Sequence, residues 1–260
     1  MAEQKIGLST LHCLGKPFAQ MIERIVEAKV RYIEVVDDGF HALDNRKTLT
    51  LRNLGESYNL KYSVHAPFAD INIASPSDFM LRVMLRRLEK SIANANSLDA
   101  YMWVFHPGLK TGISMFYPNV DWVRNRETAR LLSKIADDYS VRVAIENVPE
   151  PYPFLMKGIA DFEKFYKEVN EPIGLALDVG HANLNGQIEQ FLAKFADKIV
   201  HMHVHDNNGL EDQHLGIGYG TVNWEKFAKI LKKTEFDGVV IVESIEHVME
   251  SVEKTKQLLI

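Results

Sequence analysis

The sequence predicts a single (β/α)8 barrel, and three observations support this fold class. Short apolar segments alternate with amphipathic segments along the whole chain, which indicates a parallel sheet with right-handed crossovers. Eight such pairs fit into 260 residues, about the length of one closed barrel. The stretch Ser9-Thr-Leu-His-Cys-Leu-Gly15 lacks the glycine-rich turn of an open doubly wound sheet. We therefore expect one domain over residues 1–260.

The first half of the chain contains four strand–helix pairs. Strands are expected at residues 5–9, 31–37, 61–65 and 100–106. Pro17 opens the first helix, the second covers residues 46–58, and Ser75-Pro-Ser-Asp78 caps a long third helix. A loop over residues 109–123 should separate the fourth strand from a helix over residues 124–139.

The second half repeats the same alternation. Strands are expected at residues 141–147, 173–178, 198–205 and 238–243. Helices are expected at residues 159–169, 187–196 and 223–233. A last helix carries Val248, Val252, Thr255 and Leu259 on one side.

Composition narrows the class of protein. The net charge of −5 argues against a protein that coats nucleic acid, although it leaves room for a local basic groove. Cys13 is the only cysteine, so no intrachain disulfide can form. The sequence lacks a secretory signal and any apolar run of about 18 residues, so we expect a cytoplasmic enzyme without membrane association.

The stretch from His201 to His214 contains four histidines and three acidic residues in fourteen positions. Val200, Met202 and Val204 alternate with three of the histidines, so one strand face should be apolar and the other imidazole. Asn207-Asn-Gly209 then ends the strand. Imidazoles and carboxylates at a strand end suit a divalent metal ion, although solvated polar residues are the alternative.

Potential metal ligands recur at the predicted carboxyl ends of strands three to eight. They are His65, His106, Glu146, Asp178, His181, His203, Asp212, His214 and Glu243. In a (β/α)8 barrel these ends share one rim, where active sites form. Each residue alone could cap a helix or form a hydrogen bond in the core, but together they predict a metal site. Mixed oxygen and imidazole ligands suit Zn²⁺ or Mn²⁺, with Co²⁺ or Mg²⁺ as further options.

These residues also carry a resemblance to a known family. The whole chain resembles the xylose isomerase-like superfamily of barrels, which includes endonuclease IV and many sugar and sugar-phosphate isomerases and epimerases. The motifs that carry it are Val64-His-Ala-Pro-Phe68 with Asn72-Ile-Ala-Ser75, His106-Pro-Gly108, Glu146-Asn147, Asp178-Val-Gly-His181, His203-Val-His-Asp206 with Asp212-Gln-His214, and Glu243.

The resemblance implies two alternative functions. In the isomerase and epimerase branch, Glu146, Asp178, His203 and Glu243 would hold one metal ion. Glu146 and Glu243 would also transfer protons as catalytic residues, and His181 would bind the sugar or sugar phosphate. In the endonuclease IV branch, all nine residues would hold up to three Zn²⁺ ions and cleave DNA at abasic sites.

Neither branch matches completely. Leu8-Ser-Thr-Leu11 stands in place of the first-strand His-Val-Ser of endonuclease IV, and the expected rim is poor in lysine and arginine. The ketose 3-epimerases have an arginine where this chain has Gly209, and a second glutamate near Tyr152. We take the isomerase or epimerase as the leading hypothesis, the phosphodiesterase as the alternative, and a non-catalytic binding protein as the third class.

For several other residues, the sequence leaves two roles open. Glu34 could orient a ligand or substrate, or form a cap or salt bridge. His201 and His205 flank a predicted ligand, and either could support it or simply pack. Four aromatic residues, Phe68, Phe116, Tyr117 and Trp122, could wall a sugar pocket or pack a loop on the rim.

Overall fold

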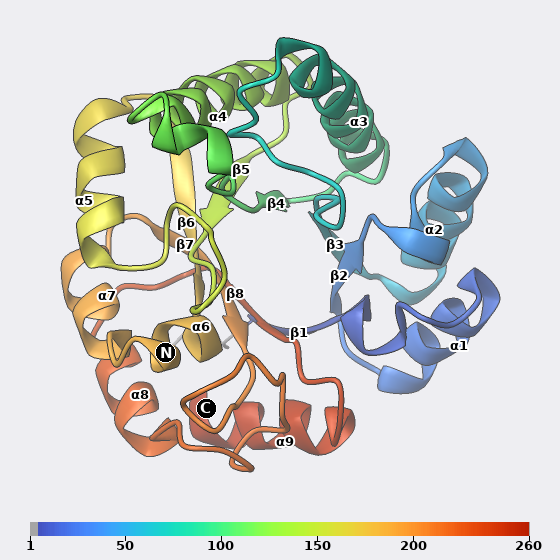
Figure 1. The fold of residues 1–260 in the computed structure, drawn as a ribbon. Helices are drawn as coiled ribbons and strands as arrows, with labels where there is room; N and C mark the ends of the chain where they lie inside the picture. The colour runs from blue at the N-terminus through green and yellow to red at the C-terminus, as the bar shows by residue number, and fades with distance from the viewer. Residues whose placement is uncertain (1–4, 260) are drawn as a thin grey trace.

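Eight parallel strands form a closed barrel in the computed structural model, which describes residues 5–259 (Figure 1). The strands are β1 (Lys5–Ser9), β2 (Tyr32–Val36), β3 (Lys61–His65), β4 (Met102–Phe105), β5 (Val143–Glu146), β6 (Ile173–Asp178), β7 (Ile199–Val204) and β8 (Val239–Val242). They pair in chain order, and β8 pairs with β1 to complete the circle. The predicted fold class is confirmed. Residues 1–4 and 260 of the predicted domain lie outside the described residues.

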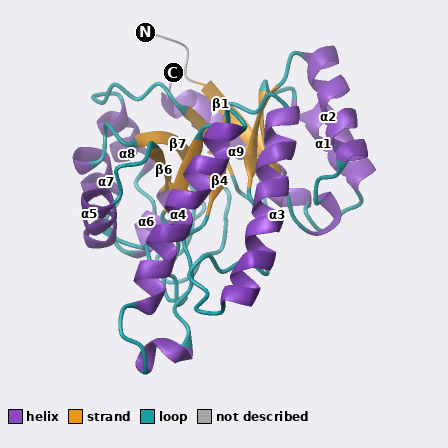
Figure 2. Cartoon of the chain, turned by 90° about the horizontal axis from the view of Figure 1, so that it is seen from above, coloured by secondary structure: helices purple, strands orange, loops and turns teal. Residues whose placement is uncertain are grey.

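A layer of helices surrounds the strands (Figures 1 and 2). The helices are α1 (Phe18–Ala28), α2 (Asn45–Tyr58), α3 (Asp78–Ser97), α4 (Val120–Asp138), α5 (Ile159–Glu168), α6 (Val179–Leu184), α7 (Ile188–Lys194), α8 (Trp224–Leu231) and α9 (Val248–Leu259). Three short 3-10 helices lie in the loops, namely η1 (Thr10–Cys13), η2 (Gly39–His41) and η3 (Gly112–Met115). Within residues 5–259, no helix is both long and apolar enough to cross a membrane.

Several predicted elements differ from the observed ones by one or two residues at an end, and two differences are larger. The predicted loop over residues 109–123 contains η3, and its end forms the first turn of α4 after Asn119, whose φ is 67°. Trp122 therefore lies in a helix. The residues after β6 form the short helix α6, which the sequence pattern did not predict. The Asp178 side chain accepts a hydrogen bond from the His181 N–H and caps this helix. With six residues, α6 is too short to show a helical periodicity in the sequence.

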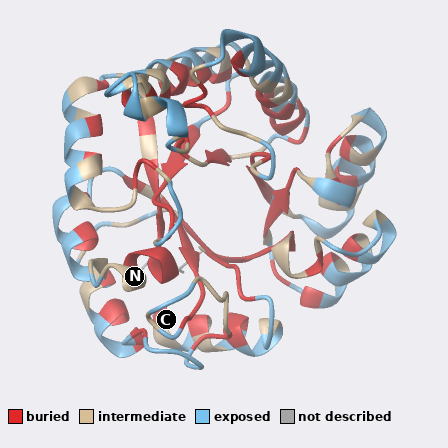
Figure 3. Ribbon diagram, in the orientation of Figure 1, coloured by how far each residue is buried: buried red, intermediate tan, exposed pale blue. Residues whose placement is uncertain are grey.

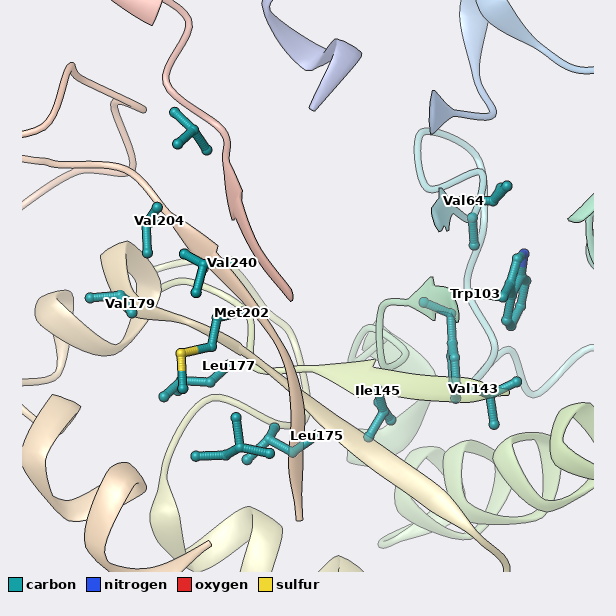
Figure 4. Close-up of a cluster of buried hydrophobic side chains, with 14 of the residues drawn as sticks. Val64, Trp103, Val143, Ile145, Leu175, Leu177, Val179, Met202, Val204 and Val240 are labelled. Atoms are coloured by element: carbon teal, nitrogen blue, oxygen red, sulfur yellow. The ribbon is translucent and has the colours of Figure 1, made fainter. Parts of the chain in front are cut away.

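The main hydrophobic core lies between the barrel and its helices. Figure 3 shows the strands as buried along their length, while the helices expose their outer faces. Figure 4 shows side chains of this core, including Trp103 on β4, Leu175 on β6 and Met202 on β7. These side chains alternate along each strand with residues that face the barrel axis, as the period of two predicts.

The barrel interior contains a second, smaller apolar cluster of Met102, Val104, Ala144 and Ala176. Ala144 precedes Glu146 by two residues and Ala176 precedes Asp178 by two, so both acids share the inward face, as predicted. One detail of the prediction was wrong. The register shifts between Leu175 and Ala176, and Val200 packs against this inner cluster instead of the outer face. The extra residue keeps His201 and His203 opposite Ala176 and Asp178.

We expect Phe162→Ala to lower the free energy of unfolding by about 3–5 kcal/mol. Phe162 on α5 is completely buried, with its ring centroid 5.5 Å from that of Phe191 on α7 and 6.2 Å from that of Phe195. Urea unfolding measures the change. Phe79→Ala is the matched control, because Phe79 on α3 is 68% exposed and should change stability by less than about 0.5 kcal/mol. Equal effects of the two substitutions would contradict this packing.

Candidate metal centre

The structure brings all nine predicted ligands together at the carboxyl end of the barrel. They fall into three adjoining groups, in each of which the potential ligand atoms lie within 4.8 Å of one another. One group is His65, His106 and Glu146, the second is Glu146, Asp178, His203 and Glu243, and the third is His181, His205, Asp212 and His214. A fourth group, Glu34, His201 and His203, lies in the barrel interior. Sequence reasoning did not include His205 or Glu34 among the ligands.

Glu146 at the end of β5 connects the first two groups. Its Oε2 lies 3.3 Å from Nε2 of His65 and 3.1 Å from Nε2 of His106. Its Oε1 lies 3.0 Å from Nδ1 of His203, and that same nitrogen lies 3.6 Å from Oε2 of Glu243. The one carboxylate therefore faces imidazoles from three different strand ends.

Asp212 organises the third group from the loop after β7. Its Oδ2 lies 3.3 Å from Nε2 of His181 and 3.4 Å from Nε2 of His214. Nε2 of His205 lies 3.2 Å from Oδ1 of Asp178 and 3.7 Å from Oδ1 of Asp212, so His205 lies between the second and third groups. His214 has a φ of 48°, an uncommon value for a residue with a side chain and one that often marks a functional site.

Three of the imidazoles are fixed by backbone carbonyls. Nδ1 of His65 lies 2.9 Å from the carbonyl of Ala66, Nδ1 of His181 lies 2.8 Å from that of Asn147, and Nδ1 of His214 lies 3.0 Å from that of Glu243. A carbonyl oxygen can only accept a hydrogen bond, so each Nδ1 carries the proton. Each ring therefore presents an unprotonated Nε2 toward the carboxylates when neutral, which is the orientation a metal ligand requires.

The geometry of the neighbouring loops explains other parts of the motifs that carry the family resemblance. The Asn72 side chain accepts a hydrogen bond from the N–H of Leu109 and donates one to its carbonyl. A Cβ on Gly108 would lie 2.3 Å from that of Ala74, so only glycine permits this approach. Similarly, a Cβ on Gly180 would lie 2.1 Å from Cε1 of His205. These contacts hold the loop after His106 and the ring of His205 in place.

Asp178 performs two tasks. Its Oδ1 accepts a hydrogen bond from the N–H of His181 at 2.7 Å and caps α6. Helix capping is the structural role that the sequence left open for each of these residues alone. Its Oδ2 is buried and has no hydrogen-bond partner among residues 5–259. A buried oxygen in that condition is costly, and a bound cation would satisfy it. This atom, together with the oxygen and nitrogen donor set, fits a divalent metal ion.

The charges of the site are balanced by imidazoles. Burial alone would raise the pKa of Glu146, but His203 and His106 outweigh it and hold this pKa well below its usual value. Burial alone would lower the pKa of His65, but the Glu146 carboxylate raises it to about 9. Burial opposes a charged His181 in the same way, yet Asp178 and Asp212 raise its pKa to about 10. Without a metal ion, both imidazoles are therefore protonated at neutral pH.

A cavity of about 590 Å³ opens above the three groups. Its floor includes Glu146, His181 and Glu243, and its walls are mostly apolar, with Phe68, Tyr152 and Phe154 among them. Of the four aromatic residues considered from the sequence, only Phe68 lines this cavity. Phe116 and Tyr117 are exposed on the loop before α4, and Trp122 donates a hydrogen bond to Glu168.

No lysine or arginine lines this cavity among the residues that the structure describes. Three arginines of α4 form ion pairs elsewhere. Arg124 pairs with Asp78, Arg126 pairs with Glu168, and Arg130 pairs with Glu171. The described lining of the cavity therefore lacks the lysine and arginine side chains with which proteins usually bind a phosphate backbone.

The fold and the cluster of carboxylates and imidazoles at the strand ends define a (β/α)8 barrel with a candidate multi-ligand metal centre. The family described as Xylose isomerase-like TIM barrel matches residues 22–259, and the chain belongs to this family. The uncharacterized protein MJ1311 of Methanocaldococcus jannaschii is 30% identical over 99% of this chain and 88% of its own length.

Two solved structures share the fold. A D-tagatose 3-epimerase-like protein is 30% identical, with a TM-score of 0.92 over 98% of this chain and 97% of the other. A D-psicose 3-epimerase, solved in the presence of D-fructose, is 16% identical, with a TM-score of 0.79 over 98% of this chain and 97% of the other. Structural neighbours of this chain thus include sugar epimerases.

We expect the metal-free protein to lose stability as the pH rises from about 7 to about 10. The folded-state pKa values of His65 and His181, about 9 and about 10, lie above the ordinary value of about 6.5 in the unfolded chain. Their stabilising contribution is therefore complete below about pH 6.5 and disappears as the pH passes through the folded-state values. Urea unfolding with a chelator present measures this dependence.

The control for this prediction is the double substitution His65→Gln and His181→Gln. It removes two of the titrating rings and should reduce the pH dependence over the same window, while His203 and His214, whose pKa values neighbouring carboxylates raise against the effect of burial, retain part of it. A wild-type protein whose stability is constant or increases between pH 7 and pH 9 would contradict the assigned protonation.

Proposed function

We propose that this protein is a divalent-metal-dependent isomerase or epimerase of a sugar or sugar phosphate. The observation that carries the proposal is the group Glu146, Asp178, His203 and Glu243, which places two glutamates in one metal-type cluster at the floor of a cavity. The similarity to the D-tagatose 3-epimerase-like protein supports the same reaction class. The mostly apolar cavity, which no described lysine or arginine lines, suits a small substrate better than a polyanion.

Proton transfer at carbon requires a base and an acid beside the reacting atom. A bound divalent ion would polarise the adjacent substrate oxygens and make the C–H bond more acidic. In our proposal, Glu146 and Glu243 are the catalytic residues. One carboxylate takes the proton from carbon and the other returns a proton, so the substrate regains its hydrogen with changed configuration or position. His181 lines the cavity, and its Nε2 lies 3.3 Å from Oδ2 of Asp212. It would orient a substrate hydroxyl.

Asp178 and His203 complete the ligand set without reaching the substrate in this proposal. Asp178 is completely buried and offers the oxygen that has no other partner. His203 is also completely buried and offers Nδ1. Zn²⁺ and Mn²⁺ suit these donors best, and Co²⁺ or Mg²⁺ would also fit.

We expect Glu243→Gln to lower the rate of proton exchange by about 10²–10⁴-fold, because an amide cannot transfer the proton. The assay incubates the metal-loaded protein with a panel of ketoses, aldoses and their phosphates in D₂O and measures deuterium at carbon by mass spectrometry. Glu246→Gln is the matched control, since Glu246 is exposed three residues further along the chain. An active wild-type enzyme that keeps full activity in Glu243→Gln would exclude the proposed role.

A second function is favoured by one specific observation, the two further ligand groups beside the central one. His65 and His106 in one group, and Asp212 and His214 in the other, are surplus to a single metal ion. Three metal ions could generate hydroxide and hold the entering and leaving oxygens of a phosphodiester. The alternative, which the resemblance to endonuclease IV implies, is a multi-zinc phosphodiesterase that acts on abasic-site DNA.

Metal analysis separates these two functions. One ion per chain after purification and exchange favours the isomerase or epimerase, and three zinc ions favour the phosphodiesterase. Incubation with duplex DNA that contains one abasic site is the direct test of the alternative, and absence of incision at high enzyme concentration would exclude it.

A further inference from the structure

Glu34 on β2 is a completely buried carboxylate inside the barrel, below the metal centre. It is not among the nine ligands that the sequence predicts. It lies against histidines of β7 and a serine of β3, and the described residues provide no lysine or arginine as its partner. Burial of a carboxylate in these surroundings costs free energy of folding, which indicates that Glu34 has a functional role.

The two oxygens of Glu34 serve different neighbours. Oε2 accepts a hydrogen bond from Oγ of Ser63 at 2.9 Å and lies 2.9 Å from Nε2 of His201. Ser63 in turn accepts a hydrogen bond from the hydroxyl of Tyr101 at 3.2 Å. Oε1 has one close neighbour, Nε2 of His203, at 2.8 Å. This contact is too bent to be a hydrogen bond in the structure, and neither atom has any hydrogen-bond partner in the described part of the chain.

His203 needs such a partner because of its position. The other fixed imidazoles lie beyond their strands or at strand ends, where backbone carbonyls are free to anchor them. His203 lies within β7, between β6 and β8, where strand pairing uses the backbone, as in the hydrogen bond from the N–H of Glu243 to the carbonyl of Val204. Only a side chain inside the barrel can anchor its second nitrogen, and Glu34 occupies that place.

We propose that Glu34 is a positioning residue, which accepts the Nε2 proton of His203 and thereby directs the unprotonated Nδ1 of His203 toward the metal ion. This inference rests on the metal site of the proposed function. A carboxylate behind a metal-binding imidazole fixes the ring and makes its free nitrogen a better donor. Nδ1 already faces the site, 3.0 Å from Glu146 and 3.6 Å from Glu243.

A carboxylate is required here because hydrogen-bond donors face it from both sides. Glutamine has one accepting and one donating end. If its carbonyl faced Ser63 and His201, its amide would donate to Nε2 of His203 and shift the ring proton to Nδ1, toward the metal ion. If its carbonyl faced His203, its amide would oppose the donors of Ser63 and His201. Either arrangement weakens the anchor of His203.

The test is the affinity of Glu34→Gln for Zn²⁺, measured by competition with a chelating dye at pH 7.5 on the full-length protein. We expect the ion held by His203 to bind about 10–100-fold more weakly than in the wild type. Ser63→Ala is the matched control, because it removes a donor to Oε2 and leaves Oε1 with His203 intact. Its affinity should stay within about threefold of wild type.

A second measurement determines which ring nitrogen of His203 carries the proton. In the ¹⁵N-labelled, Zn²⁺-loaded wild-type protein, long-range ¹H–¹⁵N spectra should show the His203 proton on Nε2, with the signals assigned by comparison with His203→Gln. This readout remains decisive if Glu34→Gln does not fold. A proton on Nδ1 would overturn the inference, and so would unchanged Zn²⁺ affinity in Glu34→Gln.

The two proposals fail in different ways. A wild-type protein that binds Zn²⁺ tightly while Glu34→Gln binds it equally well contradicts the role of Glu34 alone. A wild-type protein that binds none of Zn²⁺, Mn²⁺, Co²⁺ and Mg²⁺ contradicts the proposed function, and the inference about Glu34 with it.

Discussion

The burial of several carboxylates at one end of the barrel, with imidazoles as their nearest cationic neighbours, is the constraint on which this structure depends. Glu146, Asp178 and Glu243 have little or no exposure, and unpaired negative charges of this kind cannot remain in an apolar interior. The surrounding histidines can neutralise them by taking protons, and a metal ion can do so by replacing those protons. In the proposed function, the cluster therefore exchanges its bound protons for a metal ion.

The barrel interior is shaped to serve that cluster. Small side chains at Ala144 and Ala176 leave space on the axis for larger polar side chains from the opposite strands. Glu34, Ser63 and His201 fill this space as a connected hydrogen-bonded group, and the second carboxylate oxygen of Glu34 lies 2.8 Å from Nε2 of His203. Thus the polar layer below the site replaces part of the aliphatic packing usual in such barrels, and the outer core supplies the hydrophobic stabilisation.

Much of the fold and the clustering of the candidate ligands could be predicted from the sequence, because both depend on local patterns. The alternation of apolar strands and amphipathic helices predicts the barrel, and the topology then places His65, Asp178 and Glu243 at one rim although more than 170 residues separate the first from the last. The resemblance to a known family supplied the specific roles of these residues.

The remaining features depend on tertiary geometry that no local pattern contains. Glu34 lies across the barrel from His203, so its role requires knowing which strands face each other through the axis. His205 joins the site only because α6 begins directly after β6 and Gly180 leaves room for the ring. The bulge at Val200 depends on how β6 and β7 pair, and a strict period of two placed that side chain on the wrong face.

The short helix α6 begins at the candidate metal centre, with Asp178 as its N-cap. Asp178 offers one oxygen to the first turn of this helix and the other to the site, so the order of the helix and the occupancy of the centre share a single side chain. An ion that changes the orientation of this carboxylate would change the strength of the hydrogen bond that caps α6. A motion of α6 would, in turn, change the affinity for the ion. The rate of amide hydrogen exchange in α6 would then report whether a metal ion is bound, without any need for substrate.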